Sequence, residues 1–370
     1  MTPTPRSGAG PTVSVVIPVY NGAPWIGETL ASLGAQTLTD WEAIVVDDCS
    51  PDDAAAIVAA WPDPRVRLVR MAANGGPVRA RNRGVAEARG RYIAGLDQDD
   101  LCRPERLARQ LAYLDARPEV ALLGTQAEQL LHGRVAPLAY SPHTTPMLVG
   151  WLSWIENPLV WSSVMVRGDV ARRMDPFTRP EILYAEDFDL YHRIAAHGAI
   201  ARLDEPLLLY RQHDGGASKR FTETMEASAT RVLNEAHHAL LGDQAGPVAR
   251  LLVAHTMGKR PVPDPATLVR LGDAIGTLQA AFVAARAPGR EDRKLIRWET
   301  AKRWGEIGRI ALRSGTVTLA DIVQARPPHL GLGYAGLDTL IPAATIGGVR
   351  RAAQTFAEKI IRPGPSSANT

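Results

Sequence analysis

Short β-branched runs alternate with amphipathic stretches between residues 13 and 96, and this alternation constrains the fold most strongly. Val13–Val19 and Ala43–Val46 are continuous apolar runs, which is typical of strands buried on both faces. Pro24 opens an amphipathic helix between them, and a third apolar strand is predicted over Tyr92–Leu96. A β-α-β-α-β order of this kind predicts an α/β fold with a mostly parallel, Rossmann-like sheet and helices on both faces.

The pattern changes after about Lys219, where strand signals end and helical periodicity takes over. Asp264 is predicted to cap one helix, and Glu291–Arg313 is predicted to form another. We therefore expect an α/β fold followed by an all-helical C-terminal region. The predicted divisions are a disordered N-terminus over 1–11, an α/β domain over 12–218, a helical region over 219–362 and a disordered tail over 363–370.

Composition narrows the class of protein. The 42 basic and 39 acidic residues leave a net charge of +3, so the chain lacks the basic surface of a dedicated nucleic-acid binder. Cys49 and Cys102 have neither metal-ligand nor disulfide-framework spacing, which fits a reducing compartment. Residues 1–11 have no apolar core of a signal peptide, and no stretch approaches the roughly 18 apolar residues of a membrane span. We expect a cytoplasmic location, at most peripheral to the inner face of the membrane.

Polar side chains follow three of the predicted strands at the point where each strand ends. These are the pairs Tyr20-Asn21 and Asp47-Asp48 and the run Asp97–Asp100. Ligands of open α/β sheets bind in the crevice outside the carboxyl ends of the strands. The sequence therefore predicts that the three sets converge on one site.

The run Asp97-Gln98-Asp99-Asp100 is the predicted chemical centre of that site. Because alternate side chains share a side, Asp97 and Asp99 are expected to share one cation while Asp100 turns elsewhere. Mn²⁺ and Mg²⁺ prefer oxygen ligands and are often held by one or two carboxylates together with substrate phosphates. The alternative is a solvated acidic turn that caps the helix beginning at Pro104. A second Asp-Asp pair at another strand end favours the cation site.

Six motifs, in order, carry a resemblance to a known family. They are Val15-Val16-Ile17-Pro18-Val19-Tyr20-Asn21-Gly22, Val45-Val46-Asp47-Asp48-Cys49-Ser50, Asn74-Gly75-Gly76 through Ala80-Arg81-Asn82, Leu96–Asp100, Glu186-Asp187 and Tyr210-Arg211-Gln212-His213. The span from Val13 to His213 resembles the inverting family 2 glycosyltransferases of GT-A fold. The chain departs from the family at Cys49, where glycine is usual, and at Trp161, where many relatives have histidine.

The resemblance implies a donor half of the site, with Mn²⁺ or Mg²⁺ as cofactor. It assigns nucleotide contacts to Pro18, Tyr20, Asn21 and Asp48, with Arg81 approaching the ribose or diphosphate. Asp97 is expected near the ribose and the metal, Asp99 as a direct metal ligand, and His213 as a group that reaches the metal or diphosphate. The implied donor is a nucleotide-diphosphate sugar, with a UDP-sugar as the first choice.

The resemblance also implies that Asp187, beside Glu186, is the catalytic base. A base is needed because the acceptor hydroxyl is a poor nucleophile at neutral pH. A helix N-terminus lowers the pKa of a carboxyl, whereas the neighbouring Glu186 raises it, and the sequence leaves the balance open. The alternative reading of Glu186-Asp187 is ordinary acidic charge in the first turn of a helix.

Three tryptophans and one carboxylate are the predicted acceptor side of the site. These are Trp151, Trp154, Trp161 and Asp100. Indole faces stack well on sugars, but large aromatic side chains also fill cores, so both readings stay open for each tryptophan.

The segment Leu337–Ile361 mixes apolar and basic residues at helical spacing. A basic amphipathic helix of this kind lies on an anionic membrane surface or serves as a packing or oligomerisation helix. Peripheral membrane contact and a homo-oligomer are therefore both kept as predictions.

We interpret the chain as a metal-dependent inverting glycosyltransferase that acts on a glycan, glycolipid or glycoconjugate in polysaccharide or cell-envelope assembly. One alternative is a catalytically silent nucleotide-sugar-binding or scaffold protein. Another is a polyprenyl-phosphate glycosyltransferase, which the lack of a predicted membrane span disfavours. A Rossmann oxidoreductase is disfavoured because no G-x-G-x-x-G follows the first strand.

Overall fold

The structure is a computed structural model that describes residues 10–138, 140–213, 215–216, 220–327, 330, 340–348 and 350. The chain divides into two compact units. The first comprises Met1–Ser153 and Asn157–Val232, and the second comprises Trp154–Glu156 and Leu233–Thr370. We call them the α/β unit and the helical unit.

The α/β unit is built on one mixed sheet, which within the described residues has nine strands. Its parallel part contains β3 (Val66–Arg70), β2 (Trp41–Asp47), β1 (Val13–Val19) and β4 (Tyr92–Gly95) in that spatial order. The short antiparallel strand β8 (Met165–Arg167) joins β4 to a second parallel pair, β6 (Val120–Leu131) and β9 (Ala199–Gln212). The remaining antiparallel strands are β5 (Leu101–Cys102), which pairs with β9, and β7 (Arg134–Pro137), which forms a hairpin with β6.

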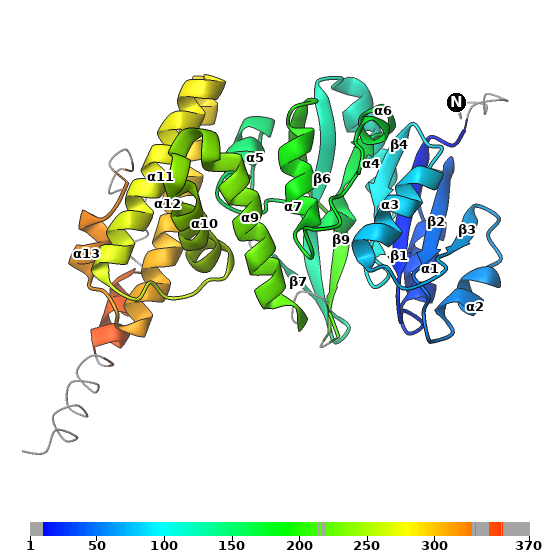
Figure 1. The fold of residues 1–370 in the computed structure, drawn as a ribbon, viewed down its shortest axis with the longest axis horizontal. Coiled ribbons are helices and arrows are strands. Elements are labelled where there is room, and N and C mark those ends of the chain that lie inside the picture. Colours follow the sequence, from blue (N-terminus) through cyan, green and yellow to red (C-terminus); the bar gives the residue numbers. More distant parts are fainter. Residues whose placement is uncertain are drawn as a thin grey trace, which may run out of the picture. The chain divides into compact units, whose positions relative to one another are not determined.

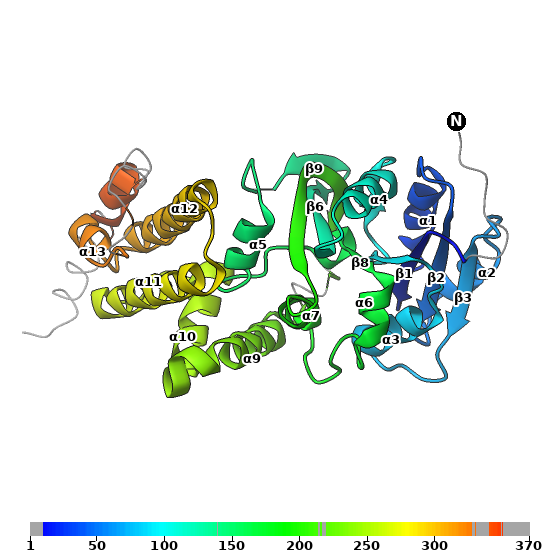
Figure 2. The same ribbon diagram turned by 90° about the horizontal axis from the view of Figure 1, so that it is seen from above.

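Helices cover both faces of this sheet (Figures 1 and 2). One face carries α1 (Ile26–Gly34), α2 (Ala54–Ala59) and α4 (Arg106–Ala116), and the other carries α3 (Pro77–Glu87), α5 (Pro146–Leu152), α6 (Gly168–Arg173) and α7 (Glu186–Ile194). Successive residues of β1 serve the two cores, because side chains alternate along a strand. Val15 and Ile17 pack with Leu30 and Leu107, whereas Val16 packs with Ala80. The predicted fold class is confirmed.

The apolar pattern of the sequence predicts a strand only over Leu207–Tyr210, just before His213, whereas β9 spans Ala199–Gln212. The part of β9 before Leu207 carries Arg202, Asp204 and Pro206, which break the apolar pattern on which the prediction depends. Proline cannot donate to a ladder and is tolerated at bulges. The β6–β9 register shifts on both sides of the Gln126–Pro206 pair, which accommodates this proline. The strands β5 and β8 were not predicted, because two or three residues show no periodicity.

The helix α9 (Thr222–Leu241) begins in the α/β unit and continues into the helical unit. Its further elements are α10 (Ala245–Leu252), a π-helical turn over Val253–Met257, α11 (Pro265–Arg286), α12 (Arg290–Ser314) and α13 (Leu319–Gln324). The predicted cap of α11 is confirmed, since an Asp264 carboxylate oxygen accepts the Thr267 backbone N–H at 2.7 Å. The sequence predicts a helical region after residue 219, and the described part of this region contains helices and no strand (Figure 1).

One helix corrects the sequence expectation about membrane spans. Within the described part of the chain, α11 is long and apolar enough to cross a membrane by length and composition. Arg270 and Asp273 interrupt its apolar run, but its many alanines, leucines and valines keep the mean hydropathy high. Leu268, Leu271 and Ile275 are buried inside the helical unit. Core helices share this pattern, so it assigns no membrane role.

Several predictions lie outside the described residues. They concern disorder at residues 1–9 and 363–370 and most of the basic amphipathic segment Leu337–Ile361. They stay predictions, as does the role of that segment on a membrane or in an oligomer.

A buried ion-pair cluster joins α12 to the segment Trp154–Glu156 within the helical unit. The Arg303 guanidinium donates to Glu156 at 2.7 Å and to Glu299 at 2.6 Å. The Glu299 side chain is 1% exposed, so its charge is compensated almost entirely by Arg303. Removing one member of such a cluster leaves the others charged and desolvated.

We predict that Arg303→Met lowers the free energy of unfolding of the helical unit by about 3–5 kcal/mol, because two carboxylates lose their cation. Urea unfolding measures this loss. Arg303→Lys is the matched control, since it keeps the charge but loses the fork of donors, and it should lose less. Equal unfolding midpoints for wild type and Arg303→Met would contradict the prediction.

Candidate active site

The strand ends that the sequence predicted to converge are linked by hydrogen bonds. Gln98 joins the acidic run to the end of β1, because it accepts the Tyr20 backbone N–H at 2.9 Å and donates to the Tyr20 carbonyl at 3.2 Å. The Asn21 backbone N–H donates to the Ser50 hydroxyl at 3.2 Å, which joins the ends of β1 and β2. A Cβ at Gly22 would lie 2.3 Å from the Gln98 amide oxygen, so a larger residue there would displace the side chain that bonds Tyr20.

The predicted nucleotide residues lie at this edge in different environments. Pro18 is buried within β1, whereas Tyr20 is 49% exposed. Asn21 and Cys49 have φ values of 53° and 61°. Asparagine tolerates this left-handed region and glycine favours it. Cys49 therefore adopts the conformation suited to the glycine that is usual in the family.

Asp48 shapes the loop that precedes α3. Its two carboxylate oxygens accept the backbone N–H groups of Gly75 and Gly76, each at 2.7 Å, and its side chain is almost fully buried. The Asn74 amide donates to the Asp48 carbonyl at 3.1 Å. The Asp48 carboxylate is thus a loop anchor, and its contact with a base edge stays a prediction.

The three carboxylates of the acidic run have three different environments. Asp100 turns into the protein, where it is 1% exposed and accepts the Arg211 backbone N–H at 2.8 Å. Asp99 faces His213, with 2.8 Å between Oδ2 and Nε2. Asp97 keeps 35% of its side chain exposed and lies 3.8 Å from the Arg81 guanidinium. Close packing around Asp97 raises its pKa to about 6, with Arg81 opposing the rise and Asp99 adding to it.

Asp99 and His213 are the residues best placed to hold a divalent cation. No group of three or more His, Cys, Asp or Glu side chains clusters closely enough for a metal among the residues that the structure describes. The predicted trio of Asp97, Asp99 and His213 is therefore not a preformed three-ligand cage. A carboxylate oxygen and an imidazole nitrogen nevertheless suit Mn²⁺. Cations of this kind commonly use one or two protein ligands and substrate phosphates, so the pair fits such an ion.

Asp187 occupies the first turn of α7. Its Oδ2 accepts the Asn157 side-chain amide at 3.0 Å, and its Oδ1 accepts the Phe188 backbone N–H at 2.7 Å. Burial raises the pKa of Asp187 to about 6, the Glu186 charge adds to this rise, and Asn157 and Arg81 oppose it. The sequence left the pKa undecided between helix dipole and like charge. Burial, which local sequence does not report, is the largest cause.

Arg81 lies between the two groups of carboxylates. Its guanidinium donates to Glu186 at 2.6 Å, lies 3.8 Å from Asp97 and stacks 4.2 Å above the Trp161 ring. The arginine side chain is 5% exposed. A buried cation thus connects the acidic run to the N-terminus of α7. The predicted approach of Arg81 to ribose or diphosphate stays a prediction.

The predicted acceptor side is not supported at most of its residues. Trp151 is fully buried in α5 and Trp161 is 4% exposed beneath Arg81, so neither offers an indole face to a sugar. Asp100 is equally buried. The burial of the two tryptophans fits the packing alternative, because their bulk fills the core. Trp154 belongs to the helical unit, where its ring packs against Phe282 at 5.3 Å.

Sequence reasoning missed several residues of the site. Arg211 donates to the Asp99 carbonyl at 2.8 Å and to Glu28 at 2.6 Å, and its guanidinium lies over the Trp25 ring. Tyr191, one helical turn after Asp187, is fully buried, and burial raises its pKa well above the ordinary value. Asn157 bonds Asp187 directly. The one available signal was Asn157-Pro158, a dipeptide typical of turns.

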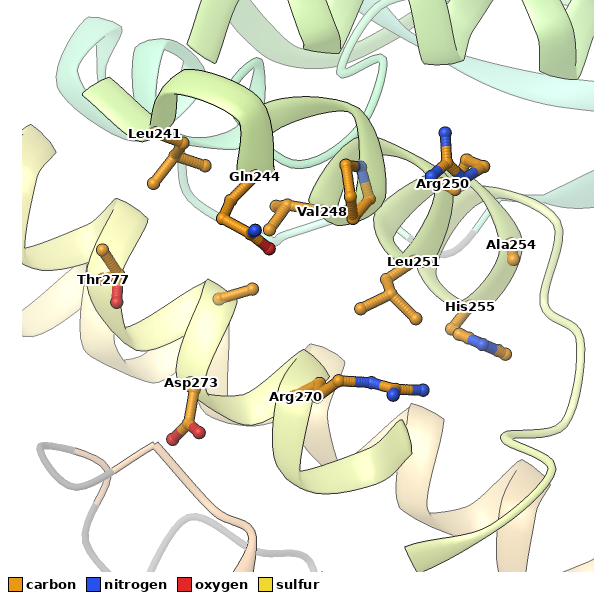
Figure 3. A pocket seen from close by; sticks show the side chains of 12 residues that line it. Leu241, Gln244, Val248, Arg250, Leu251, Ala254, His255, Arg270, Asp273 and Thr277 are labelled. Atoms are coloured by element: carbon orange, nitrogen blue, oxygen red, sulfur yellow. The ribbon is translucent and has the colours of Figure 1, made fainter. Parts of the chain in front are cut away.

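The helical unit contains a separate pocket (Figure 3). Its volume is about 650 Å³, and it lies between α10 with the following π-helical turn and α11. Leu241, Val248 and Leu251 line it together with Arg270 and Asp273. None of the predicted site residues lines this pocket.

Comparison with known proteins places the α/β unit in context. Residues 14–134 match the family model described as Glycosyl transferase family 2. Succinoglycan biosynthesis protein ExoO of Rhizobium meliloti is 50% identical over 106 residues, which are 29% of this chain and 30% of that protein. O-antigen biosynthesis protein RfbC of Myxococcus xanthus is 30% identical over 249 residues, which are 65% of this chain and 19% of that protein. The chain thus spans less than a third of either relative.

A solved structure shares the fold. S. aureus TarS 1–349 in complex with UDP-GlcNAc superposes with a TM-score of 0.54 and 19% identity over 92% of both chains. At that identity the likeness concerns the fold, which is of GT-A type with a helical C-terminal region.

We predict that Asp187→Asn raises the free energy of unfolding at pH 8 by about 1–3 kcal/mol. The folded pKa is about 6, whereas the unfolded one is near 3.9, so ionised Asp187 destabilises the fold above pH 6. The gain should shrink as pH falls through 6 and vanish near pH 4, where the wild-type carboxyl is increasingly protonated in both states.

Unfolding curves at pH 8 and pH 4 measure this difference. Asp189→Asn is the matched control on the same helix, because Asp189 pairs with Arg179 and Arg193 and its loss should destabilise at pH 8. An equal effect of Asp187→Asn at both pH values would argue against a raised pKa.

Proposed function

We propose that this chain, whose residues 14–134 match the model of glycosyl transferase family 2, moves a sugar from a nucleotide-diphosphate sugar to a hydroxyl of a glycan, glycolipid or glycoconjugate acceptor, with inversion at the anomeric carbon. The main support for the proposal is one buried arginine that connects two groups of residues, one suited to stabilising the leaving group and one suited to accepting a proton. Asp99 and His213 form the leaving-group half, Asp187 forms the proton half, and Arg81 lies between Asp97 and Glu186.

The leaving diphosphate accumulates negative charge as the bond from the sugar C1 to the phosphate oxygen breaks. Asp99 and His213 would hold Mn²⁺ or Mg²⁺, and the bound ion would supply charge stabilisation to that diphosphate. The Asp99–His213 distance of 2.8 Å supports their action at one point. His213 also contacts the Trp25 ring at 5.1 Å between centroids, which restricts the orientation of its imidazole.

Asp187 is the proposed general base. As the acceptor oxygen forms its bond to C1, the hydroxyl proton passes to an Asp187 carboxylate oxygen and the nucleoside diphosphate leaves. A base works best when its pKa lies near the operating pH. A pKa of about 6 leaves most Asp187 side chains ionised at pH 7 while making them more basic than an ordinary aspartate. A solvated aspartate, with a pKa near 3.9, would be fully ionised at pH 7 but would be a weaker base.

Arg81 has a positioning part in this proposal. Its contacts with Glu186 and Asp97 fix both halves relative to each other, since a buried charge that left its partners would be desolvated and unpaired. Its charge also keeps the pKa of Asp187 from rising further.

The donor class comes from the family resemblance, and UDP-sugars are the first donors to test. The acceptor class draws on the relatives, two of which are named for succinoglycan and O-antigen biosynthesis. Both names denote assembly of surface polysaccharides, so we propose a role in cell-envelope glycan assembly.

We expect Asp187→Asn and Asp99→Ala each to reduce sugar transfer to background, because one removes the proton acceptor and the other removes a ligand of the cation. Release of nucleoside diphosphate in the presence of Mn²⁺ and acceptor measures the rate. Asp169→Asn is the control, since its side chain is 64% exposed, and it should keep the wild-type rate. Full turnover by Asp187→Asn would refute the assignment of the base.

Donor binding is tested separately from chemistry. Nucleoside diphosphates of uracil, guanine and thymine with Mn²⁺ should be screened by thermal unfolding, where a ligand at 100 times its Kd stabilises by about 2.7 kcal/mol. We expect one of them to stabilise wild type and Asp187→Asn equally. In wild type, EDTA should remove the metal-dependent part of the increase in Tm. Asp99→Ala should lack this part even without EDTA. No shift with any of the three would count against a nucleotide-sugar site.

A further inference from the structure

Asn157 belongs to none of the six sequence motifs, yet its surroundings fix it firmly. It lies between α5 and β8, and Pro158 restricts the residue before it to an extended backbone. The Pro158 carbonyl accepts a bond from the Arg202 guanidinium at 3.3 Å. Leu159 is 4% exposed and packs so closely on Gly124 that a Cβ there would lie 2.7 Å from it.

The orientation of the Asn157 amide follows from its two hydrogen bonds. Its oxygen accepts the Leu159 backbone N–H at 3.3 Å, the arrangement of an asparagine that bonds its own backbone two residues on. With the oxygen used in this way, the amide nitrogen faces Asp187 and donates to Oδ2 at 3.0 Å. A flipped amide would lose both bonds, since nitrogen cannot accept and oxygen cannot donate.

The two oxygens of Asp187 are held from two different parts of the chain. Oδ1 bonds the Phe188 N–H within the first turn of α7, and Oδ2 bonds Asn157, which is 30 residues away in sequence. The contact from outside α7 limits rotation of the carboxylate about its own side-chain bonds. A carboxylate oxygen accepts more than one hydrogen bond, so both oxygens keep room for a proton.

We infer that Asn157 is a positioning residue, whose amide holds the Asp187 carboxylate in the orientation that receives the acceptor proton. This inference rests on the proposed function. Asn157 does not itself touch the reacting atoms in this scheme. It acts through Asp187, on the orientation of the base and on its basicity.

Burial and the Glu186 charge raise the pKa of Asp187, whereas the Asn157 amide, Arg81 and the Phe188 backbone N–H lower it. The charge of the same carboxylate also acts on the buried Tyr191 hydroxyl. Asn157 is the neutral side chain among the groups that lower the pKa. Its removal should therefore shift the acid limb of the rate profile to higher pH, because the ionised base loses a donor.

The decisive comparison is Asn157→Ala with Asn157→Asp. We expect Asn157→Ala to lower kcat about 10- to 100-fold, as misplacement of a reacting group does, with unchanged donor affinity and an acid limb at higher pH. Asn157→Asp places a second carboxylate against Asp187, so its acid limb should move further and its rate should recover partly at high pH. Asn234→Ala, at a partly buried asparagine of the helical unit, is the control and should change neither quantity.

A measurement independent of turnover separates this inference from the proposed function. In carbonyl-labelled protein, ¹³C NMR follows the titration of Asp187, with Asp187→Asn used to assign the signal. We expect the Asp187 pKa to rise in Asn157→Ala even if no donor or acceptor is turned over. An unchanged titration with an unchanged rate profile would overturn the inference. Loss of donor affinity together with kcat, without movement of the acid limb, would indicate a general structural role and would overturn it equally.

Discussion

The buried ion pair between Arg81 and Glu186 is the interaction on which the site depends. The two side chains are 5% and 7% exposed and meet at 2.6 Å. Removing two ions from water costs several kcal/mol each, and the pair offsets this only while its geometry holds. Because Arg81 lies on α3 and Glu186 opens α7, the pair fixes two helices that are far apart in sequence. The indole of Trp161 beneath the guanidinium leaves the arginine little freedom to move.

Burial gives similar carboxylates different chemistry. Asp97 and Asp187 both have pKa values raised to about 6, whereas Asp100 is so deeply buried that its pKa rises well above the ordinary value. Asp99, beside His213, lies at the position best suited to a cation. Four aspartates therefore have distinct electrostatic environments. The difference follows from depth and neighbours, since the residue type is the same.

A short segment of the helical unit directly precedes Asn157 in the chain. Trp154–Glu156 are part of this unit, where Ile155 accepts a bond from Thr256 at 3.0 Å and Glu156 pairs with Arg303. The next residue in the chain is Asn157, which bonds Asp187. The two residues that precede Asn157 are therefore held by hydrogen bonds from Thr256 and Arg303.

Local patterns in the sequence are sufficient to predict the parallel β-α-β core and the edge at which the polar groups gather. Apolar runs, turn residues and helix caps are local signals, and β1, β2, β4 and the Asp264 cap followed them. Tertiary structure alone decided which groups meet. Arg81 and Glu186 are 105 residues apart, and Asp99 and His213 are 114 apart, so local patterning cannot report their distances. It also decided that Trp151 and Trp161 are core residues, that burial governs the pKa of Asp187, and that Asn157 faces it. Burial and long-range contact exist only once the chain has packed, which is why the sequence could name candidate residues but not their distances, their burial or their partners.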